Sequence, residues 1–293
     1  TIEAGTVVKF NPGTRLVADG ILDVQGTSEN RVVFTSYRDD QYGGDTNGDG
    51  PSDGNRGDWK YIHLRNSDIV FEHSLIRYAG RDDHFGLYAG NGSTPIIRDN
   101  VLEYCGQRSS SRHGGVCVHQ GSNPLIENNT VRGGTGQSGD SGIRVNDDSY
   151  ATIRGNTILG HKVGSHSLSI CVDVQSNVIS GTTFAIYING GEVIDNDIRN
   201  SSYAIYQGYR SDPAYEGNTF SNCTNHVIGV HGALGSDAVW DDVQGMGWPY
   251  LVVGNVTVPE GVTLSIDPGM VVKFDAVRGN GYRHNLIVAG TLN

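Results

Sequence analysis

Oxygen-bearing side chains recur at every second position from residue 45, where the sequence reads Asp-Thr-Asn-Gly-Asp-Gly. Oxygen ligands at positions one, three and five, followed by a glycine for the sharp turn, suit a loop that curls around a hard cation the size of calcium. Arg56 stands at the twelfth position, where an EF-hand requires glutamate. The sequence therefore predicts a Ca²⁺ loop that is not an EF-hand, with ligands from Asp45, Asn47, Asp49, the Pro51 carbonyl and Asp53.

The alternative is an acidic, glycine-rich excursion that binds no ion. An excursion from Tyr37 to Trp59 needs some internal order, however, and one cation would neutralise several carboxylates while closing the loop. Asp39, Asp40 and Asp58 are near enough in the sequence to supply the missing charge. We expect a structural role for the ion, with modest affinity because the closing carboxylate is absent.

A second set of side chains could perform acid–base chemistry in a groove. Arginine would neutralise a uronate, histidine or tyrosine would act as a base, and aspartate would act as an acid or a metal ligand. The sequence contains no paired-carboxylate motif of the hydrolase kind and no triple-carboxylate motif, so ordinary surface polarity remains the competing interpretation. The candidates for a catalytic role are Asp83, His84, His113, Asp140, Arg144 and His166.

Aromatic side chains offer a third kind of chemistry, which is the binding of sugars. Tyrosine rings on a flat strand face can stack on carbohydrate with little loss of entropy, although packing across neighbouring strands would explain them equally well. An apolar/any/apolar alternation places several rings and polar groups on the outward side of the predicted strands, with Tyr88, Tyr187 and Tyr206 in one column. These carbohydrate-binding candidates are Tyr88, His119, Asp173, Tyr187 and Tyr206.

The elements that must position these residues are indicated by a recurring asparagine. Each asparagine stands two residues before one apolar residue and usually three after another, at intervals of 29, 27, 21, 19 and 22 residues: Asn100, Asn129, Asn156, Asn177, Asn196 and Asn218. A repeat of about 20 residues with short strands and tight corners predicts a parallel β-helix with coils stacked ~4.8 Å apart. Asparagines at one corner can then exchange amide hydrogen bonds along the stack.

This repeated coil resembles the pectate-lyase-like superfamily of right-handed parallel β-helices. That superfamily includes polysaccharide lyases, glycoside hydrolases, epimerases, phage tailspikes and non-enzymatic surface proteins. The resemblance implies an all-β, right-handed, single-stranded parallel β-helix, into which the calcium loop at 37–59 is inserted. Coil pattern alone identifies a fold and leaves the chemistry open.

Composition narrows the possible partners. The formal net charge is −11 and the arginines are scattered singly, so we expect no binding to nucleic acid and no attraction to anionic membranes. No apolar run is long enough to insert into a membrane. We predict four free thiols, because Cys117 and Cys171 are expected in one column two coils apart, beyond the reach of a disulfide.

A longer period is superimposed on the coils. The first ten residues, ending in Val7-Val8-Lys9-Phe10, reappear at 265–274, a shift of 264 residues. We interpret residues 1–237 as one unit that lacks its opening segment, and 238–293 as the opening coils of the next unit. The arrangement resembles the tandem units of very large secreted bacterial β-helix proteins. Exposed coil ends carry unpaired strand edges and are expected to associate end to end with other copies.

These observations favour a non-enzymatic, extracellular or cell-surface segment stabilised by calcium, acting as a stalk, filament or surface-binding module. Repetition of a whole unit adds reach to a spacer but adds little to an enzyme. The alternative is a polysaccharide lyase, epimerase or glycoside hydrolase that acts on an acidic polysaccharide at the outward face of the coils.

Overall fold

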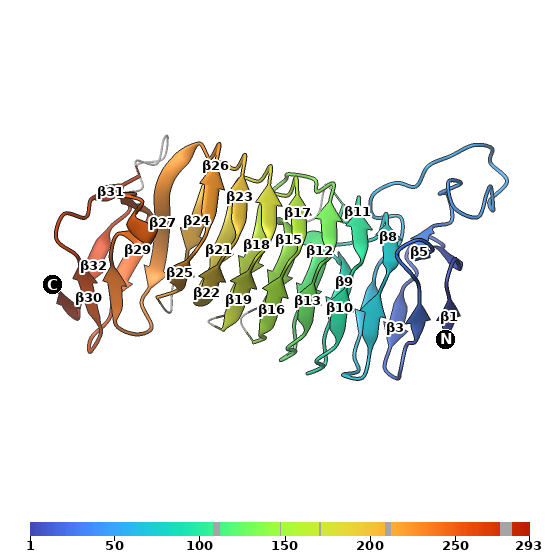
Figure 1. Cartoon of the computed structure of the whole chain (residues 1–293), viewed down its shortest axis with the longest axis horizontal. Coiled ribbons are helices and arrows are strands. Elements are labelled where there is room, and N and C mark those ends of the chain that lie inside the picture. Colours follow the sequence, from blue (N-terminus) through green and yellow to red (C-terminus); the bar gives the residue numbers. More distant parts are fainter. Residues whose placement is uncertain (108–111, 147, 170, 209–211, 276–282) are drawn as a thin grey trace.

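The computed structural model describes residues 1–107, 112–146, 148–169, 171–208, 212–275 and 283–293. The chain winds into stacked coils along one axis, with the N-terminus near one end and the C-terminus near the other (Figure 1). Most coils contain three short strands, and each strand pairs in parallel with the equivalent strand of the next coil. The parallel β-helix predicted from the sequence is therefore confirmed.

Strands of successive coils form three long sheets. The longest sheet, here called the long sheet, contains β3 (Leu16–Ala18), β6 (Ile62–Leu64), β9 (Phe85–Ala89), β12 (His113–Val118), β15 (Asp140–Val145), β18 (Val163–Ser167), β21 (Phe184–Ile188), β24 (Tyr203–Gln207), β27 (Asn225–Ala233), β29 (Tyr250–Val258), β31 (Val272–Phe274) and β32 (Leu286–Val288). The nine-stranded sheet contains β2 (Val7–Phe10), β5 (Val32–Ser36), β8 (Ser74–Arg77), β11 (Val101–Glu103), β14 (Thr130–Arg132), β17 (Thr157–Leu159), β20 (Val178–Ser180), β23 (Asp197–Arg199) and β26 (Thr219–Ser221).

The third long sheet and two small ones complete the coils. The seven-stranded sheet contains β7 (Val70–Glu72), β10 (Ile96–Arg98), β13 (Leu125–Glu127), β16 (Ala151–Arg154), β19 (Val172–Gln175), β22 (Gly191–Ile194) and β25 (Ala214–Glu216). The small sheets pair β1 (Ile2–Glu3) with β4 (Val24–Gln25), and join β28 (Ala238–Trp240), β30 (Thr263–Ile266) and β33 (Thr291–Leu292). One 3₁₀ turn, η1 (Val243–Gly245), is present, and no helix in the described part of the chain could span a membrane.

The asparagine ladder, which comprises the six asparagines of the sequence repeat, forms one buried corner of the coils. Asn129 donates from its backbone N–H and its Nδ2 to Oδ1 of Asn156, at 2.9 and 3.0 Å, and the same pattern joins each neighbouring pair. Gln244 closes the ladder by accepting from Asn218. Buried donors and acceptors in this corner are thus satisfied by the next coil, as the sequence predicts.

Each ladder asparagine follows a residue with positive φ that turns the chain from the seven-stranded sheet into the nine-stranded sheet. Glycine fits this conformation without strain, and Asn, Asp and Ser occupy it here at modest cost. The turn residues and their φ angles are Asp99 (56°), Asn128 (55°), Gly155 (64°), Ser176 (54°), Asp195 (55°) and Gly217 (65°).

One coil departs from the sequence-based register. The sequence at 169–172 shows the same apolar/any/apolar alternation, preceded by a small residue, as the long-sheet strands of other coils. The long-sheet strand of this coil is nevertheless β18. Its inward positions are Ser165 and Ser167, paired with Ile143 and Val145, so the usual apolar alternation is absent. The placement of Cys171 and Asp173 in the outward column is therefore wrong: Asp173 belongs to β19 in the seven-stranded sheet. All four cysteines are nevertheless free.

The excursion between β5 and β6 is fixed to the coils by a buried ion pair. Arg77 Nη1 lies 2.8 Å from Asp39 Oδ2, with both side chains at most 5% exposed. Ser36 donates to Asp58 at 2.6 Å, and the indole of Trp59 donates to the Arg77 carbonyl at 2.8 Å. These contacts give both ends of the excursion a defined position, while its middle extends away from the coils (Figure 1).

The long sheet continues across residue 237, because β27 pairs directly with β29. The division at 237/238 into two repeat units remains a prediction from the sequence. The two copies of the repeated segment differ in burial: Phe10 is 8% exposed and stacks on Trp59, whereas its counterpart Phe274 is 50% exposed.

Candidate functional site

One row of side chains runs along the outward side of the long sheet, and its first four members are at most 8% exposed. The cross-strand register aligns one outward residue from each coil, and we call this row the outward column: His63, Tyr88, Cys117, Arg144, His166, Tyr187 and Tyr206. The prediction that Tyr88, Tyr187 and Tyr206 share a column is confirmed. His166 occupies the place that the sequence pattern assigned to Cys171.

A pocket of about 350 Å³ opens over the N-terminal part of this column. Basic and aromatic groups dominate its lining, and among the described residues Asp83 is its one carboxylate. The lining residues are Tyr61, His63, Arg65, Asp83, His84, Phe85, Tyr88, Arg112, Cys117, His119, Gln120, Arg144 and Asn146.

A chain of hydrogen bonds crosses the pocket. Arg65 Nε lies 3.2 Å from His63 Nδ1, and His63 Nε2 lies 3.1 Å from His119 Nε2. Because a guanidinium can only donate, Nδ1 of His63 accepts and the ring carries its proton on Nε2. That proton is donated to Nε2 of His119, so His119 is protonated on Nδ1. Burial and the neighbouring His119 lower the pKa of His63 to about 4, which keeps the ring neutral at pH 7.

Tyr88 forms a second polar group in the pocket. Its hydroxyl oxygen accepts from the backbone N–H of Phe85 at 2.9 Å and lies 3.2 Å from His84 Nδ1. The simplest arrangement has the hydroxyl donating to Nδ1, which leaves His84 protonated on Nε2. Burial raises the pKa of Tyr88 and lowers that of His84, so both groups are neutral at pH 7.

Arg144 and His166 form the next part of the column. Arg144 Nη1 donates to His166 Nδ1 at 3.0 Å, and Ser141 Oγ lies 3.2 Å from the same nitrogen. Burial and the Arg144 charge lower the pKa of His166 to about 3. Arg144 also donates to Asn146 Oδ1 at 3.1 Å.

Aromatic rings continue the column towards the C-terminal end. The rings of Tyr187 and Tyr206 stack with centroids 5.3 Å apart, and His166 lies 4.6 Å from Tyr187. His231 Nε2 lies 2.7 Å from the Tyr187 hydroxyl. From His63 to Tyr206 the column covers six strand spacings, about 29 Å.

The structure separates the sequence-predicted catalytic candidates into two groups. Asp83, His84 and Arg144 meet in the pocket with the carbohydrate-binding candidates Tyr88 and His119, and His166 adjoins Arg144.

The groove position predicted for His113 and Asp140 is wrong, because both are fully buried. Asp140 Oδ1 lies 2.9 Å from His161 Nδ1, and His113 Nε2 lies 2.7 Å from Thr135 Oγ1. Burial acts to raise the pKa of Asp140, but the hydrogen bond and charge of His161 outweigh it and lower that pKa. His113 and Asp140 are the first residues of β12 and β15, and both lie in a polar corner beneath the surface.

Sequence reasoning missed His63, Arg65 and Tyr61. His63 lies in β6, and Tyr61 and Arg65 flank that strand. The coil of β6 has Ser74 in the position of a ladder asparagine, so the asparagine repeat gave no register here. The alternation of buried Ile62 and Leu64 around His63 is the signal that could have placed His63 in the column.

The excursion brings three carboxylates together. Oxygen atoms of Asp40, Asp45 and Asp49 lie within 4.8 Å of one another. Asp45 accepts from the backbone N–H groups of Gly48 and Gly50, at 2.7 and 3.1 Å, which curls the loop. Asp40 Oδ1 and Asn47 Oδ1 are buried atoms with no hydrogen-bond partner among the described residues.

These features fit an oxygen-ligated cation held by Asp40, Asp45, Asn47 and Asp49. Asp53 lies outside this carboxylate group and accepts from Gln41 at 3.1 Å, while Pro51 is exposed. Asp40, which the sequence suggested only as a source of extra charge, belongs to this carboxylate group, whereas Asp53 does not.

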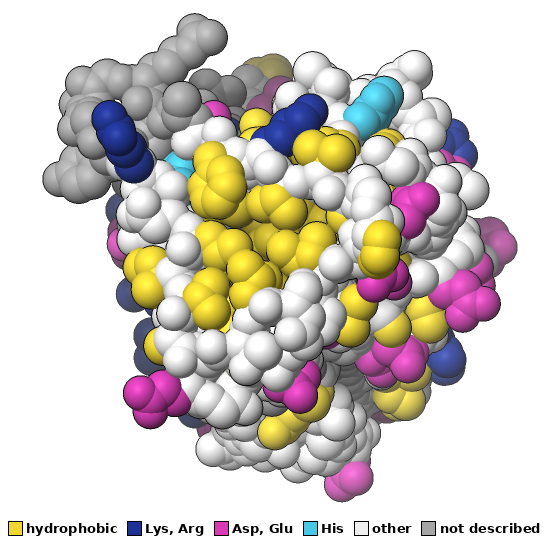
Figure 2. Space-filling model, turned by 90° about the vertical axis from the view of Figure 1, so that its left-hand side faces the viewer, with side chains coloured by type: hydrophobic (Ala, Val, Ile, Leu, Met, Phe, Trp, Pro, Cys, Tyr) yellow, Lys and Arg dark blue, Asp and Glu magenta, His cyan; other side chains and the backbone are white. Residues whose placement is uncertain are grey.

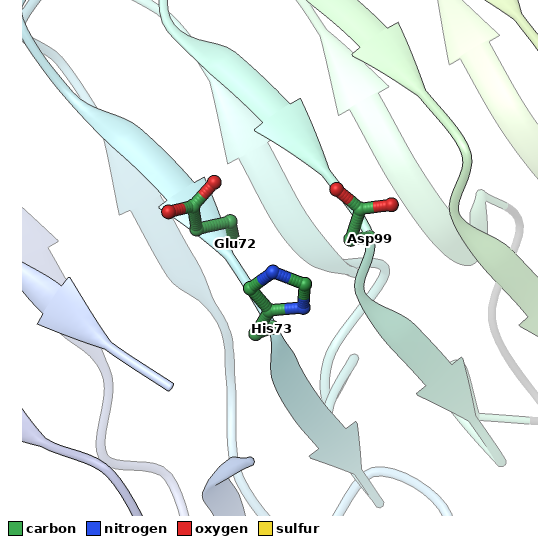
Figure 3. Close-up of side chains that lie close together, drawn as sticks. All are labelled: Glu72, His73 and Asp99. Carbon is green, nitrogen blue, oxygen red and sulfur yellow. The ribbon is translucent and has the colours of Figure 1, made fainter. Parts of the chain in front are cut away.

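Glu72, His73 and Asp99 form another close group at the turn between the seven- and nine-stranded sheets (Figure 3). Arg98 pairs with Glu72 at 2.5 Å, which already neutralises part of its charge. His73 and Asp99 both have positive φ and hold equivalent places in successive coils.

Comparison with known proteins agrees with the coil architecture. Residues 56–191 match the family model described as a right handed beta helix region. No curated protein and no solved structure gave a significant match to the chain. With its stacked coils of parallel strands, the chain is a right-handed parallel β-helix, consistent with the pectate-lyase-like superfamily that its sequence resembles.

Proposed function

We propose that this β-helix is a non-enzymatic segment of an extracellular or cell-surface protein that binds an extended carbohydrate along the outward column. The observation that carries the proposal is the continuous cross-strand register of the outward column, which aligns Cys117 with aromatic, histidine and arginine side chains over about 29 Å. A row of rings and hydrogen-bonding groups repeated at the strand spacing suits a polymer lying parallel to the helix axis. A rigid β-helix presents such a row without ordering it at the moment of binding.

The state of the pocket histidines supports binding without catalysis. In His63, His119 and His166, the one ring nitrogen that could accept a proton already accepts a hydrogen bond. A general base needs that lone pair free to reach the substrate proton. The pocket also contains one carboxylate among its described residues, whereas most glycosidases use two.

Binding is tested with soluble neutral and acidic polysaccharides, including pectate, alginate and hyaluronan, by isothermal titration calorimetry. Replacing Tyr187 or Tyr206 by alanine should weaken binding about two- to tenfold, because each ring contributes roughly 0.5–1.5 kcal/mol of stacking. Tyr150→Ala, a change at a 46% exposed tyrosine outside the column, is the matched control. Equal affinity in all variants would contradict the proposed surface.

The same samples distinguish the proposal from a lyase, epimerase or hydrolase. Unsaturated products, new reducing ends or epimerised sugars formed in proportion to protein concentration would overturn the non-enzymatic proposal. Loss of that activity in Tyr88→Phe or Arg144→Ala, with an unchanged melting temperature, would assign it to the pocket.

We further propose that Ca²⁺ stabilises the excursion between β5 and β6. The support is the convergence of Asp40, Asp45 and Asp49 with the buried, unpartnered Asn47 Oδ1. A cation there would neutralise like charges held within 4.8 Å and would leave the pocket chemistry unchanged.

A further inference from the structure

We propose that the pocket is a built hydrogen-bond donor site for an oxyanion, and that Arg65 is the positioning residue that sets its donor pattern. The inference rests on the proposed binding function and names the ligand chemistry of the same site. It depends on the direction of the hydrogen bonds that run from Arg65 through His63 to His119, and the guanidinium of Arg65 determines that direction.

Arg65 must be the donor in the first hydrogen bond of this chain, because its guanidinium has no acceptor atom. Its Nε donates to His63 Nδ1 at 3.2 Å, and this fixes the proton of the neutral ring on Nε2. The 3.1 Å contact to His119 Nε2 is then a donation from His63 to His119. His119 consequently carries an N–H on Nδ1, which has no hydrogen-bond partner among the described residues.

Gly90 makes this contact possible. A β-carbon at position 90 would lie 2.3 Å from His63 Nε2 and 2.7 Å from His119 Nε2, closer than atoms can approach. The two imidazoles therefore meet over a residue without a side chain, and any larger residue at position 90 would push them apart.

Donors therefore outnumber charged acceptors in the described lining of the pocket, where Asp83 is the one carboxylate. His119 presents Nδ1–H, and His84 presents Nε2–H when the Tyr88 hydroxyl donates to its Nδ1. Arg65 and Arg112 add positive charge to the lining. Such a set matches the lone pairs of an oxyanion, such as a carboxylate or a sulfate ester. It disfavours a transition-metal ion, because a metal requires the imidazole lone pairs that are already occupied.

The tautomers are tested by long-range ¹H–¹⁵N NMR of the full chain without ligand. We expect His63 protonated on Nε2 and His119 on Nδ1. Arg65→Met should give mixed tautomers at both rings, and Arg65→Lys should retain the original pattern because lysine can also donate. Melting temperatures of all three proteins show whether a spectral change reflects unfolding.

His63 protonated on Nδ1, or tautomers unaffected by Arg65→Met in a folded protein, would overturn the role of Arg65. Because no ligand is present, this result is independent of whether a polysaccharide binds.

The ligand class is tested by titrating the same protein with sulfate and with acetate, which distinguish a tetrahedral from a planar oxyanion. A saturable shift of the His119 and His84 signals with either anion supports the site, and the stronger anion identifies the preferred geometry. His119→Phe, which keeps the ring but removes the N–H, should weaken binding about tenfold. No saturable shift with either anion, or a saturable shift with Zn²⁺ alone, would overturn the oxyanion proposal.

Discussion

At the scale of single residues, the environment of each histidine decides its chemistry. His63 is 5% exposed and lies between Arg65 and His119, so a proton on its acceptor nitrogen would meet a guanidinium. His161, in contrast, has Asp140 as its partner at 2.9 Å. Residues of one type thus differ in function according to whether their neighbour donates or accepts.

Acidification should destabilise the protein through His63. Its pKa in the folded state is about 4, below the ordinary value of 6.5, so the unfolded chain binds more protons between these values. Stability should fall as the pH is lowered from 6.5 towards 4. Urea unfolding at pH 7 and pH 4.5 measures this loss.

His63→Gln should lose less stability than the wild type over that interval, because glutamine does not titrate. Carboxylates titrate in both proteins, so the difference between them isolates the histidine. A variant with the same pH dependence as the wild type would refute the assignment. His226→Gln, outside the pocket and stacked on Trp248, serves as the control.

At the scale of elements, columns of side chains join successive coils. Asn156 accepts from two donors of Asn129 and donates to Asn177 Oδ1 and to the Ile126 carbonyl. Each asparagine therefore serves its own coil and both neighbours, in a corner that contains almost no solvent.

Asn156→Ala should lower the free energy of unfolding by about 2–4 kcal/mol, because it leaves buried donors of Asn129 without an acceptor. The exposed Asn11→Ala should change stability by less than about 0.5 kcal/mol. Denaturant unfolding at neutral pH measures both. A loss below 1 kcal/mol in Asn156→Ala would show that water or local movement satisfies those donors.

The excursion between β5 and β6 gives a second prediction at this scale. If the loop binds Ca²⁺ as proposed, the ion should raise the melting temperature of the wild-type protein and chelator should reverse the rise, because a ligand that binds only the folded state stabilises that state. Asp49→Asn should abolish most of the Ca²⁺-dependent rise, since Asp49 belongs to the carboxylate group.

Asp53→Asn is the matched control for Asp49→Asn. It removes the same charge from the same loop, but Asp53 lies outside the carboxylate group. A greater loss of the Ca²⁺ response in Asp53→Asn than in Asp49→Asn would favour the ligand set inferred from the sequence.

At the scale of the whole molecule, the end formed by β30–β33 exposes a broad group of apolar side chains (Figure 2). Phe274, Val288 and Leu292 are 50%, 41% and 44% exposed, although Phe10, the counterpart of Phe274, is 8% exposed. Unpaired strand edges beside an apolar surface favour addition of further strands.

We expect this end to associate with a second copy of the chain. Light scattering should show a mass that rises with protein concentration, and Phe274→Lys with Val288→Lys should reduce that rise. Tyr150→Lys, at a similarly exposed ring on the side of the coils, should leave it unchanged. A constant monomer mass at all concentrations would exclude end-to-end association under those conditions.

The sequence by itself determined the coil, the asparagine ladder and the column of tyrosines. These features repeat at fixed offsets, because the same turn and the same buried corner must form in every coil. The acidic loop was also evident from the spacing of Asp45, Asn47 and Asp49, since these oxygen-bearing side chains are neighbours in the chain.

Only the tertiary structure decided which polar residues meet. Serines replace the inward apolar residues of β18, so this strand lacks the apolar alternation from which the other strands were located. His166 was therefore assigned outside the column. His113 and Asp140 begin their strands at a buried corner, whereas His63 and His119, 56 residues apart, converge over Gly90. Coil stacking brings together residues with no local sequence relationship, and a one-residue change of register reverses which side chains are buried.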